Sequence, residues 1–567
     1  MTQRITRRRF LESAGRVVAA ASLGGGGLVL QGCSSRQDFD LVVKGGLVLD
    51  GLGNPAAPAD IGISGRLIKA VGKIPASRGR AVIEAAGLIA APGFIDAHDH
   101  TDVHLLVNPR AESSVHQGIT TTVSGNCGSS PFPMASEIFE ESKALLKKQY
   151  DVDLTWRDIR GFFARLEEKG MALNYATFVG HGAIRGAAMG FNDRAPKPEE
   201  LEKMKALVAE NLRDGALGLS SGLEYTPGSF AQPDELVELC RIVSRAGGVY
   251  ATHMRDEGDR LLESLDETID VAKKTGVSVQ ISHFKAAYPA NWGKIAAAIG
   301  RIEAAKKDGL DIFCDRYPYI AGATSLDFNF PMWARQGTTE EFLSRLKDPY
   351  QDARLRSYVA EREKKLGSWD KVVISHVLND KNRSYEGKNI LEASKEAGKP
   401  PYEFMRNLLI EENNQVGMVI FMMKEENLKR ILAHPQVGVG TDGEALAPYG
   451  PLGRGKPHPR VYGTFPRILG KYVREAKLIK LEEMIKKMTS MPARKFGLLK
   501  RGVLQAGNYA DLVVFDPDKI IDKATWADPH QFPAGMSYVL VNGEIVIDRE
   551  KHTGKLPGMI LRKKDSP

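Results

Sequence analysis

Eight strand-like runs alternate with helical stretches through the middle of this 567-residue chain. The runs cover residues 93–100, 120–127, 175–181, 216–221, 249–253, 277–283, 311–317 and 437–442. Helical patterns lie between most of them, at residues 198–212, 234–246, 259–275 and 294–308. Strands that alternate with helices form parallel sheets, and eight such units are typical of a (β/α)8 barrel. The predicted fold class is therefore α/β, with a barrel over residues 92–497.

The gap between the seventh and eighth runs is too long for a single connecting helix. It contains its own strand-like run at residues 372–375, which stands outside the count of eight. Long segments between regular elements are uncommon within a compact domain unless they have a structure of their own. We therefore expect an insertion in the barrel around residues 320–436.

Both ends of the chain have the pattern of short strands. Residues 39–44 and 47–50, with Gly45 and Gly46 at a turn between them, are followed by runs at 61–63 and 67–71. Similar runs return at residues 510–516 and 539–546. The economical interpretation is one small β-sandwich domain that combines residues 38–91 with residues 498–555.

Composition and charge exclude several classes of protein. Hydrophobic residues make up 43% of the chain and charged residues 26%, which excludes a disordered chain, a collagen and a multi-span membrane protein. The formal net charge is +8, but residues 1–32 contain five Arg and one Glu, which supply half of it. The remaining positive charge is too weak to indicate a nucleic-acid partner.

The first 32 residues have the features of an export signal. Arg7 and Arg8 precede Phe10 and a modestly apolar stretch over residues 17–30, an arrangement that resembles a twin-arginine signal. An ordinary secretory signal with extra arginines is the alternative. Residues 30–33 resemble a lipoprotein box in which Cys33 is acylated, although cleavage nearby without a lipid also fits. The leader predicts a periplasmic or cell-surface protein, anchored at a membrane surface if Cys33 carries a lipid.

Five potential metal ligands and one aspartate stand where the predicted barrel strands end. They are His98, His100, Cys127, His253, His283 and Asp442. Barrel enzymes place their chemistry at the carboxyl ends of the strands, so these side chains are expected to meet at one mouth of the barrel. Thiolate and imidazole are good zinc ligands, and a carboxylate is acceptable. Each residue alone is better explained by packing or hydrogen bonding, but together they predict a metal site.

The segments around these residues resemble those of one family of enzymes. They are Pro92-Gly93-Phe94-Ile95-Asp96 with His98 and His100, Gly125-Asn126-Cys127-Gly128, Gly222-Leu223-Glu224-Tyr225, Thr252-His253-Met254-Arg255, Ser282-His283-Phe284-Lys285 and Thr441-Asp442-Gly443. The set is similar to that of D-aminoacylases, the N-acyl-D-amino-acid deacylases of the amidohydrolase superfamily, over residues 38–550. The cysteine is the most discriminating motif, because many relatives use a carboxylated lysine that bridges two metals.

The resemblance implies a zinc-dependent enzyme. Its substrate is a small-molecule N-acyl-D-amino acid, which it hydrolyses at the amide bond to a carboxylic acid and a free D-amino acid. The implied tight zinc site consists of Cys127, His253 and His283. A second, weaker site is implied at His98 and His100, with Cys127 and Asp442.

The resemblance also implies roles for residues that contact the substrate. Asp442 is expected to act as the general base and then as the acid that protonates the leaving amine. This role agrees with the physical chemistry, because zinc lowers the pKa of bound water towards about 7 and a carboxylate beside it can take the proton. Lys285, Tyr317 and Arg460 resemble the clamp for the substrate α-carboxylate. Lys285 lies two residues past His283 and is expected on the same strand face.

The other cysteines and histidines have simpler explanations. Cys240 and Cys314 are expected to be buried in the core. His376 imitates the histidine motif of the sixth strand but lies in the insertion, and His181 is best explained as a core or hydrogen-bonded residue. Glu257 either supports the site or forms an ion pair.

Two other functions stay open from the sequence. A related amidohydrolase that acts on cyclic amides or D-residue dipeptides would share the metal ligands and differ in the clamp and the side-chain pocket. A non-catalytic surface lipoprotein would use the barrel for binding or scaffolding. The presence of Asp442 with all five ligands argues against this last alternative.

Overall fold

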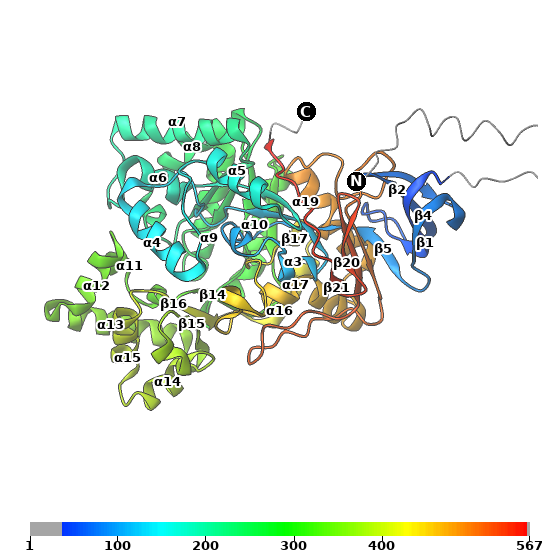
Figure 1. Cartoon of the computed structure of the whole chain (residues 1–567). Coiled ribbons are helices and arrows are strands. Elements are labelled where there is room, and N and C mark those ends of the chain that lie inside the picture. Colours follow the sequence, from blue (N-terminus) through cyan, green and yellow to red (C-terminus); the bar gives the residue numbers. More distant parts are fainter. Residues whose placement is uncertain (1–36, 564–567) are drawn as a thin grey trace, which may run out of the picture.

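The computed structural model describes residues 37–563 (Figure 1). The predicted export signal and Cys33 lie outside the described residues. Within residues 37–563, no helix combines the length and the apolar character that a membrane crossing requires.

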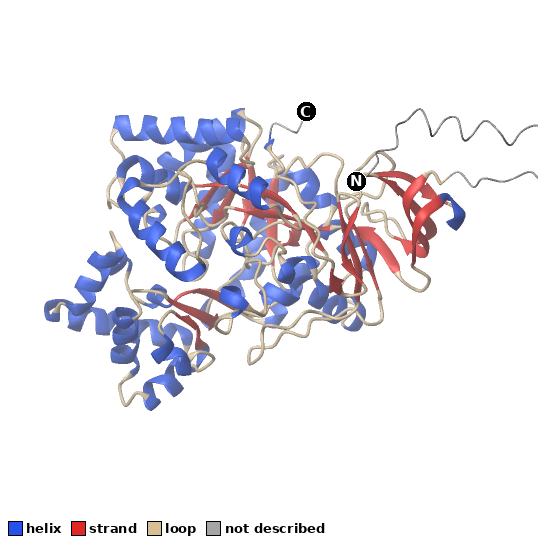
Figure 2. Cartoon of the chain, in the orientation of Figure 1, coloured by secondary structure: helices blue, strands red, loops and turns tan. Residues whose placement is uncertain are grey.

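Eight parallel strand positions from two sheets, β17-β13-β12-β11-β10-β9 and β6-β7-β8, form the predicted barrel. Figure 2 shows strands at the centre of the molecule with helices around them. The strands are β6 (Phe94–Asp96), β7 (Ile119–Ser124), β8 (Asn174–Thr177) continued by β9 (Val179–Gly180), β10 (Gly218–Gly222), β11 (Val249–His253), β12 (Ser278–Ile281), β13 (Ile312–Arg316) and β17 (Val437–Val439). The amide of Ala97, just past β6, donates a hydrogen bond of 3.1 Å to the carbonyl of Val439 on β17. This contact joins the first strand to the last and closes the ring.

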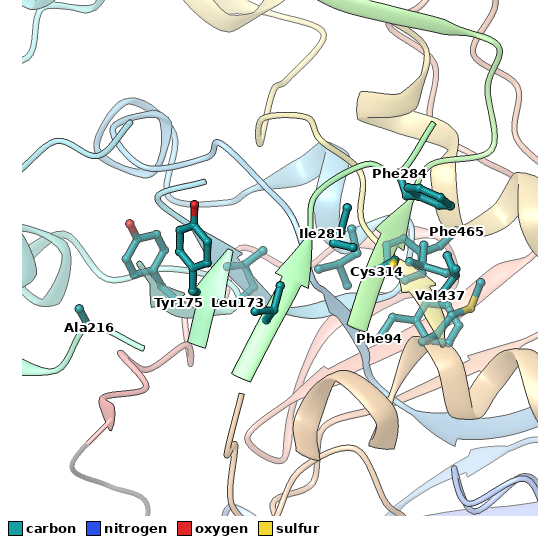
Figure 3. Packing of buried hydrophobic residues seen from close by; sticks show 14 of the residues in the cluster. Phe94, Leu173, Tyr175, Ala216, Ile281, Phe284, Cys314, Val437 and Phe465 are labelled. Atoms are coloured by element: carbon teal, nitrogen blue, oxygen red, sulfur yellow. The ribbon is translucent and has the colours of Figure 1, made fainter. Parts of the chain in front are cut away.

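Amphipathic helices cover the outside of the barrel. In α8 (Pro233–Arg245), a proline and two acidic residues start the helix, and Leu236, Cys240 and Val243 recur at helical spacing on its buried face. Figure 3 shows Cys314 of β13 packed beside Val437 of β17 in the same core. Both cysteines are fully buried, which confirms the packing role predicted for them.

Strands from the two chain ends combine into one nine-stranded sheet. Strand β18 (Leu512–Phe515) pairs antiparallel with β5 (Ile89–Pro92), which joins the C-terminal strands to the N-terminal ones. The turn predicted at Gly45 and Gly46 is wrong, because β1 (Phe39–Val48) runs through both glycines. Its register shifts between Val43 and Gly46, and Gly45 has φ +76°, so the glycines form a bulge in one continuous strand.

The insertion forms a separate lobe beside the barrel mouth (Figure 1). Its antiparallel sheet consists of β14 (Ala321–Ser325), β16 (Val416–Phe421) and β15 (Val372–Val377), in that order. The helices of the lobe are α11 (Met332–Arg335), α12 (Thr339–Lys347), α13 (Pro349–Leu366), α14 (Ile390–Glu396) and α15 (Pro401–Glu411). Phe342, Trp369 and Met405 belong to its own hydrophobic core. The following helix α16 (Glu425–Ala433) packs into the barrel core, so the barrel resumes there.

Candidate metal centre and active-site pocket

Five of the six predicted residues lie just beyond the strand ends, and His253 is the last residue of β11 (Val249–His253). Strand β7 ends at Ser124 and β12 at Ile281, so the sequence runs assigned as strands are shorter than predicted. Cys127, His283 and Asp442 have φ angles of +51°, +34° and +52°. Such left-handed conformations are uncommon outside glycine and persist where the surroundings over-determine them, which is frequent at functional sites.

Four of the ligand side chains converge on one point. The Sγ atom of Cys127 lies 3.4 Å from Nε2 of His98 and 3.5 Å from Nε2 of His283. The Oδ1 atom of Asp442 lies 3.3 Å from the same His98 nitrogen. Ligand atoms at the corners of a tetrahedron around zinc, at bond lengths of about 2.0–2.3 Å, are separated by roughly 3.3–3.6 Å. The spacing and the donor types therefore fit one metal ion.

The remaining two histidines extend this cluster in opposite directions. Nε2 of His100 lies 3.1 Å from Oδ1 of Asp442. The ring of His253 lies edge-on to that of His283, with 4.5 Å between the ring centroids. His253, His283 and Glu257 together form a second group whose ligand atoms lie within 4.8 Å of one another. All six predicted residues thus meet at the barrel mouth, and the cluster has ligands enough for two neighbouring ions.

The charges of the cluster depend on one another. Burial alone would raise the pKa of the Cys127 thiol, but His98 beside it helps to hold that pKa well below its usual range. Burial also opposes ionisation of Asp442, yet Arg460 lowers the pKa of this carboxyl well below its usual range. In His100, hydrogen bonds with Asp442 and Cys127 outweigh burial and raise the pKa to about 10. The cluster thus pairs a thiolate and a carboxylate with protonated imidazoles, whose protons a bound cation would replace.

A buried aspartate that the sequence reasoning missed supports the cluster from below. Asp315 on β13 is fully buried, and its Oδ1 lies 3.2 Å from Nδ1 of His98. The same oxygen accepts a hydrogen bond of 2.8 Å from the amide of His283. A carboxylate behind a histidine fixes the ring orientation and the tautomer. The signal in the sequence was a pair of charged residues, Asp315 and Arg316, at the end of a strand that is otherwise apolar.

The three predicted clamp residues line the same pocket but are already engaged with neighbours. Lys285 was predicted to share a strand face with His283, but both residues lie beyond the end of β12. The Nζ atom of Lys285 donates a hydrogen bond of 2.5 Å to Oε2 of Glu257. Glu257 is therefore the ion-pair partner of Lys285 and is at the same time a member of the second ligand group. Nη1 of Arg460 lies 2.7 Å from Oδ2 of Asp442, and its guanidinium stacks 4.7 Å from the ring centroid of the buried Tyr317.

The pocket above the cluster has a volume of about 500 Å³. Its charged residues come from the barrel, and its opposite wall comes from the insertion, with Gly322, Phe328, Ile420 and Met422. A second cavity of about 600 Å³ adjoins it and shares Arg460 with it. The arrangement places a cluster of potential metal ligands, a carboxylate and an arginine at one end of a pocket large enough for a small organic substrate.

Two further histidines lie outside the cluster. His181 is fully buried and its Nε2 lies 2.8 Å from Oε1 of Glu235, so it is a hydrogen-bonded core residue as predicted. His376 lies on β15 in the insertion and lines the second cavity. Neither residue belongs to the metal-ligand groups found within residues 37–563.

Comparisons with known proteins agree with this geometry. A model of the amidohydrolase family matches residues 81–547, and the chain therefore belongs to that family. It is 36% identical over 528 residues to N-acyl-D-glutamate deacylase of Alcaligenes xylosoxydans xylosoxydans, an alignment that covers 93% of this chain and 97% of the relative. D-aminoacylase of the same organism is also 36% identical, with 93% and 98% covered.

A solved structure extends the comparison to the fold. N-acyl-D-glutamate deacylase from Bordetella bronchiseptica, complexed with zinc and a phosphonate inhibitor that mimics the tetrahedral intermediate, is similar with a TM-score of 0.79 at 33% identity. The match covers 93% of this chain and 100% of that one. The predicted resemblance to the deacylases of this superfamily is confirmed, and so is the predicted barrel fold.

Proposed function

We propose that the protein is a zinc-dependent hydrolase of N-acyl-D-amino acids, which it converts to a carboxylic acid and a free D-amino acid. The observation that carries this proposal is the position of the Asp442 carboxylate. It lies against the histidines of the metal cluster on one side and against Arg460 on the other. The names and the zinc-containing structure of the relatives support the same reaction.

The assignment of residues to two metal sites follows the resemblance to the deacylase family, and the convergence of His98, Cys127, His283 and Asp442 supports a metal at this place. Cys127, His253 and His283 are assigned to the tight zinc site, and His98 with His100 to a second, weaker one that shares Cys127 and Asp442. When bound, zinc would polarise the scissile carbonyl and acidify a water molecule. The lowered pKa of Cys127 favours the thiolate, which is the form that binds metal.

Asp442 moves the protons of the reaction. Its carboxylate is ionised in this setting, so it can accept a proton from the attacking water. The same carboxyl then donates that proton to the nitrogen of the leaving D-amino acid. Arg460, at 2.7 Å from Oδ2, holds the carboxylate in place while Oδ1 faces the two histidines.

The clamp accounts for the choice of enantiomer. Arg460 and Tyr317 are assigned to bind the α-carboxylate of the substrate. Lys285 lies beside them, and one hydrogen bond of its ammonium group goes to Glu257. A zinc ion held by the ligand cluster would fix the scissile carbonyl. When the α-carboxylate and the scissile carbonyl of the substrate are both held, its side chain can point in only one direction. One enantiomer then fits, and the side chain of the other collides with the pocket wall.

A substrate panel tests the proposal. Purified protein loaded with zinc is expected to release free amino acid from N-acetyl-D-amino acids and not from their L enantiomers. Cyclic amides and D-residue dipeptides in the same panel separate the related activities from this one. Equal cleavage of the D and L forms, or activity on the cyclic amides alone, would contradict the proposal.

We propose further that the enzyme works outside the cytoplasm. The support is the leader, in which Arg7 and Arg8 precede an apolar stretch, and the lipoprotein-box pattern at Cys33. Replacing both arginines with lysine is expected to retain active precursor inside a bacterial host. Cys33→Ala is expected to release the enzyme from the membrane fraction with unchanged turnover. Normal export of the double-lysine variant would leave an ordinary secretory signal as the explanation.

A further inference from the structure

The two walls of the pocket differ in polarity. The cationic side chains of the barrel wall, Lys285 and Arg460, already have acidic partners in Glu257 and Asp442. The insertion wall presents the side chains of Phe328, Ile420 and Met422. A side chain of the substrate that lies against this wall therefore meets apolar surface.

Two arginines lie behind that wall. The guanidinium carbon of Arg335 on α11 lies 5.4 Å from the ring centroid of Phe328, and that of Arg362 on α13 lies 4.8 Å from it. Neither arginine lines the pocket, whereas Phe328 does. Cations stack favourably on aromatic faces, so these contacts also hold the ring in place.

Both arginines are short of partners. Nε of Arg335, and Nε and Nη2 of Arg362, are buried with no hydrogen-bond acceptor among residues 37–563. Neither guanidinium forms an ion pair with an acidic side chain in that part of the chain. Arg362 also contacts the side chain of Tyr288, but neither arginine has a carboxylate partner among these residues. Two such cations so close to a substrate pocket would bind a carboxylate if one could reach them.

Phe328 occupies the position between these cations and the metal cluster. It lies in the short helical turn η5 (Leu326–Asn329), half-buried, and its ring centroid is 6.2 Å from that of Tyr225. Tyr225 in turn meets His253 edge-on, with 4.9 Å between centroids. The ring therefore forms the boundary between the reacting end of the pocket and the arginines.

We propose that Phe328 is a specificity-determining residue: its ring directs the enzyme to N-acyl-D-amino acids with uncharged, nonpolar side chains and screens Arg335 and Arg362 from the pocket. This inference rests on the proposed deacylase function and decides a question that the relatives leave open, since the chain is 36% identical both to a D-glutamate-type enzyme and to a D-aminoacylase. A side-chain carboxylate against the ring has no paired cation, and burying an unpaired charge is unfavourable.

The experiment compares kcat/KM for N-acetyl-D-leucine, N-acetyl-D-glutamate and N-acetyl-D-glutamine. The wild-type enzyme is expected to prefer the leucine substrate over the glutamate substrate by about 100-fold or more. Phe328→Ala uncovers the two guanidinium groups and is expected to shift this ratio by about tenfold or more towards glutamate. The glutamine substrate has nearly the same shape without the charge, so it should not share the gain.

Matched variants separate charge from space. Phe328→Leu keeps an apolar wall and should keep the wild-type preference. Arg335→Gln combined with Arg362→Gln should leave the wild-type enzyme's preference unchanged and should remove the gain that Phe328→Ala produces. An equal gain for the glutamine substrate, or a gain that survives loss of both arginines, would overturn the screening role.

The wild-type ratio tests the inference even if Phe328→Ala does not fold. An active enzyme that prefers the glutamate substrate overturns this inference and leaves the deacylase function standing. An enzyme that is inactive on every N-acyl-D-amino acid overturns the deacylase function itself, and the specificity inference with it.

Discussion

The barrel mouth and the insertion wall face each other across one pocket and are built in opposite ways. On the barrel side, most functional groups have two or more polar partners: Asp442 contacts His98, His100 and Arg460. On the insertion side, Phe328, Ile420 and Met422 contribute apolar surface held by packing. The barrel side therefore holds the charged groups in position, and the insertion side determines the shape of the pocket.

This difference predicts two sizes of mutational effect. A substitution within the barrel cluster leaves buried charged partners unsatisfied and changes metal binding or proton transfer. A substitution on the insertion wall changes the volume available to one part of the substrate and leaves the chemistry intact. The loss of activity should therefore decrease from the barrel cluster to the insertion wall, and an equal effect on both sides would contradict the comparison.

The largest effect is expected for Cys127→Ala, which removes the thiolate shared by the ligand groups. Zinc content and turnover should be lost together, because the metal supplies the reaction with its acidified water. Metal analysis and activity on the D substrates measure both. Cys314→Ala removes a buried core cysteine and should keep the metal. Rapid labelling of Cys127 by a thiol reagent in the zinc-loaded enzyme would show that its sulfur is not a ligand.

Asp442→Asn should retain zinc at the tight site and lose about 10³-fold or more in kcat, because general base and general acid are removed together. Metal analysis beside steady-state kinetics separates this loss from a loss of metal. Asp516→Asn, at a surface ion pair with Lys519, is the matched control and should be neutral. Near-normal turnover of Asp442→Asn would reassign the proton transfer to another group.

Asp315→Asn should act through His98 and His283 rather than on the substrate. We expect about 10–100-fold weaker zinc binding, because the carboxylate behind the histidines is lost. Excess zinc should restore most of kcat. If Asp315 took part in the chemical step, added zinc would not restore it. Asp311, which pairs with Lys495 just before the same strand β13, provides the control Asp311→Asn. If Asp315→Asn bound zinc with unchanged affinity, Asp315 would not be a positioning residue for the metal ligands.

The barrel side was predictable from the sequence because its residues follow a regular rule. Parallel strands in a barrel end at one mouth, so predicted ligands at the ends of five of the eight strands identify the site, even though β7, β12 and β17 end before Cys127, His283 and Asp442. The predicted strand lengths failed because the positive φ angles at these residues depend on tertiary contacts. The bulge at Gly45 was missed for a similar reason, since two glycines fit a turn and a bulge equally well.

The insertion side was not predictable, because no periodic pattern says which loop faces the pocket. Phe328 and Met422 are almost a hundred positions apart in sequence and reach one wall only through the pairing of β14 with β16. The partners of Lys285 were also beyond sequence reasoning. A lysine after a histidine motif gives no sign that Glu257 lies 2.5 Å from its Nζ. Contacts of this kind depend on how distant segments pack together, and they cannot be predicted from the spacing of residue types in the sequence.

The smallest effect is expected for Gly322→Ala on the insertion wall. Gly322 is a buried residue of β14 that lines the pocket, and a Cβ there would lie 3.1 Å from the terminal methyl of Met422 and 3.7 Å from the hydroxyl of Tyr317. The flexible methionine can move away from the first contact, so the fold should tolerate the change. The added methyl instead narrows the pocket beside the proposed clamp. We expect kcat/KM to fall by roughly tenfold for N-acetyl-D-leucine, which is the lower end of the effect of one methylene group in a pocket.

The same variant should cleave N-acetyl-D-alanine at the wild-type rate, because the smaller side chain does not need the lost space. Its zinc content should also be unchanged, because the three atoms nearest to the new methyl belong to Met422, Tyr317 and Ile420, none of which is a proposed metal ligand. Gly300→Ala, at a helical position with open space around the new Cβ, is the matched control and should alter neither substrate. An equal loss on the leucine and alanine substrates would mean that the insertion wall also positions the reacting groups, and the division between a charge-fixing barrel and a shape-fixing insertion would then fail.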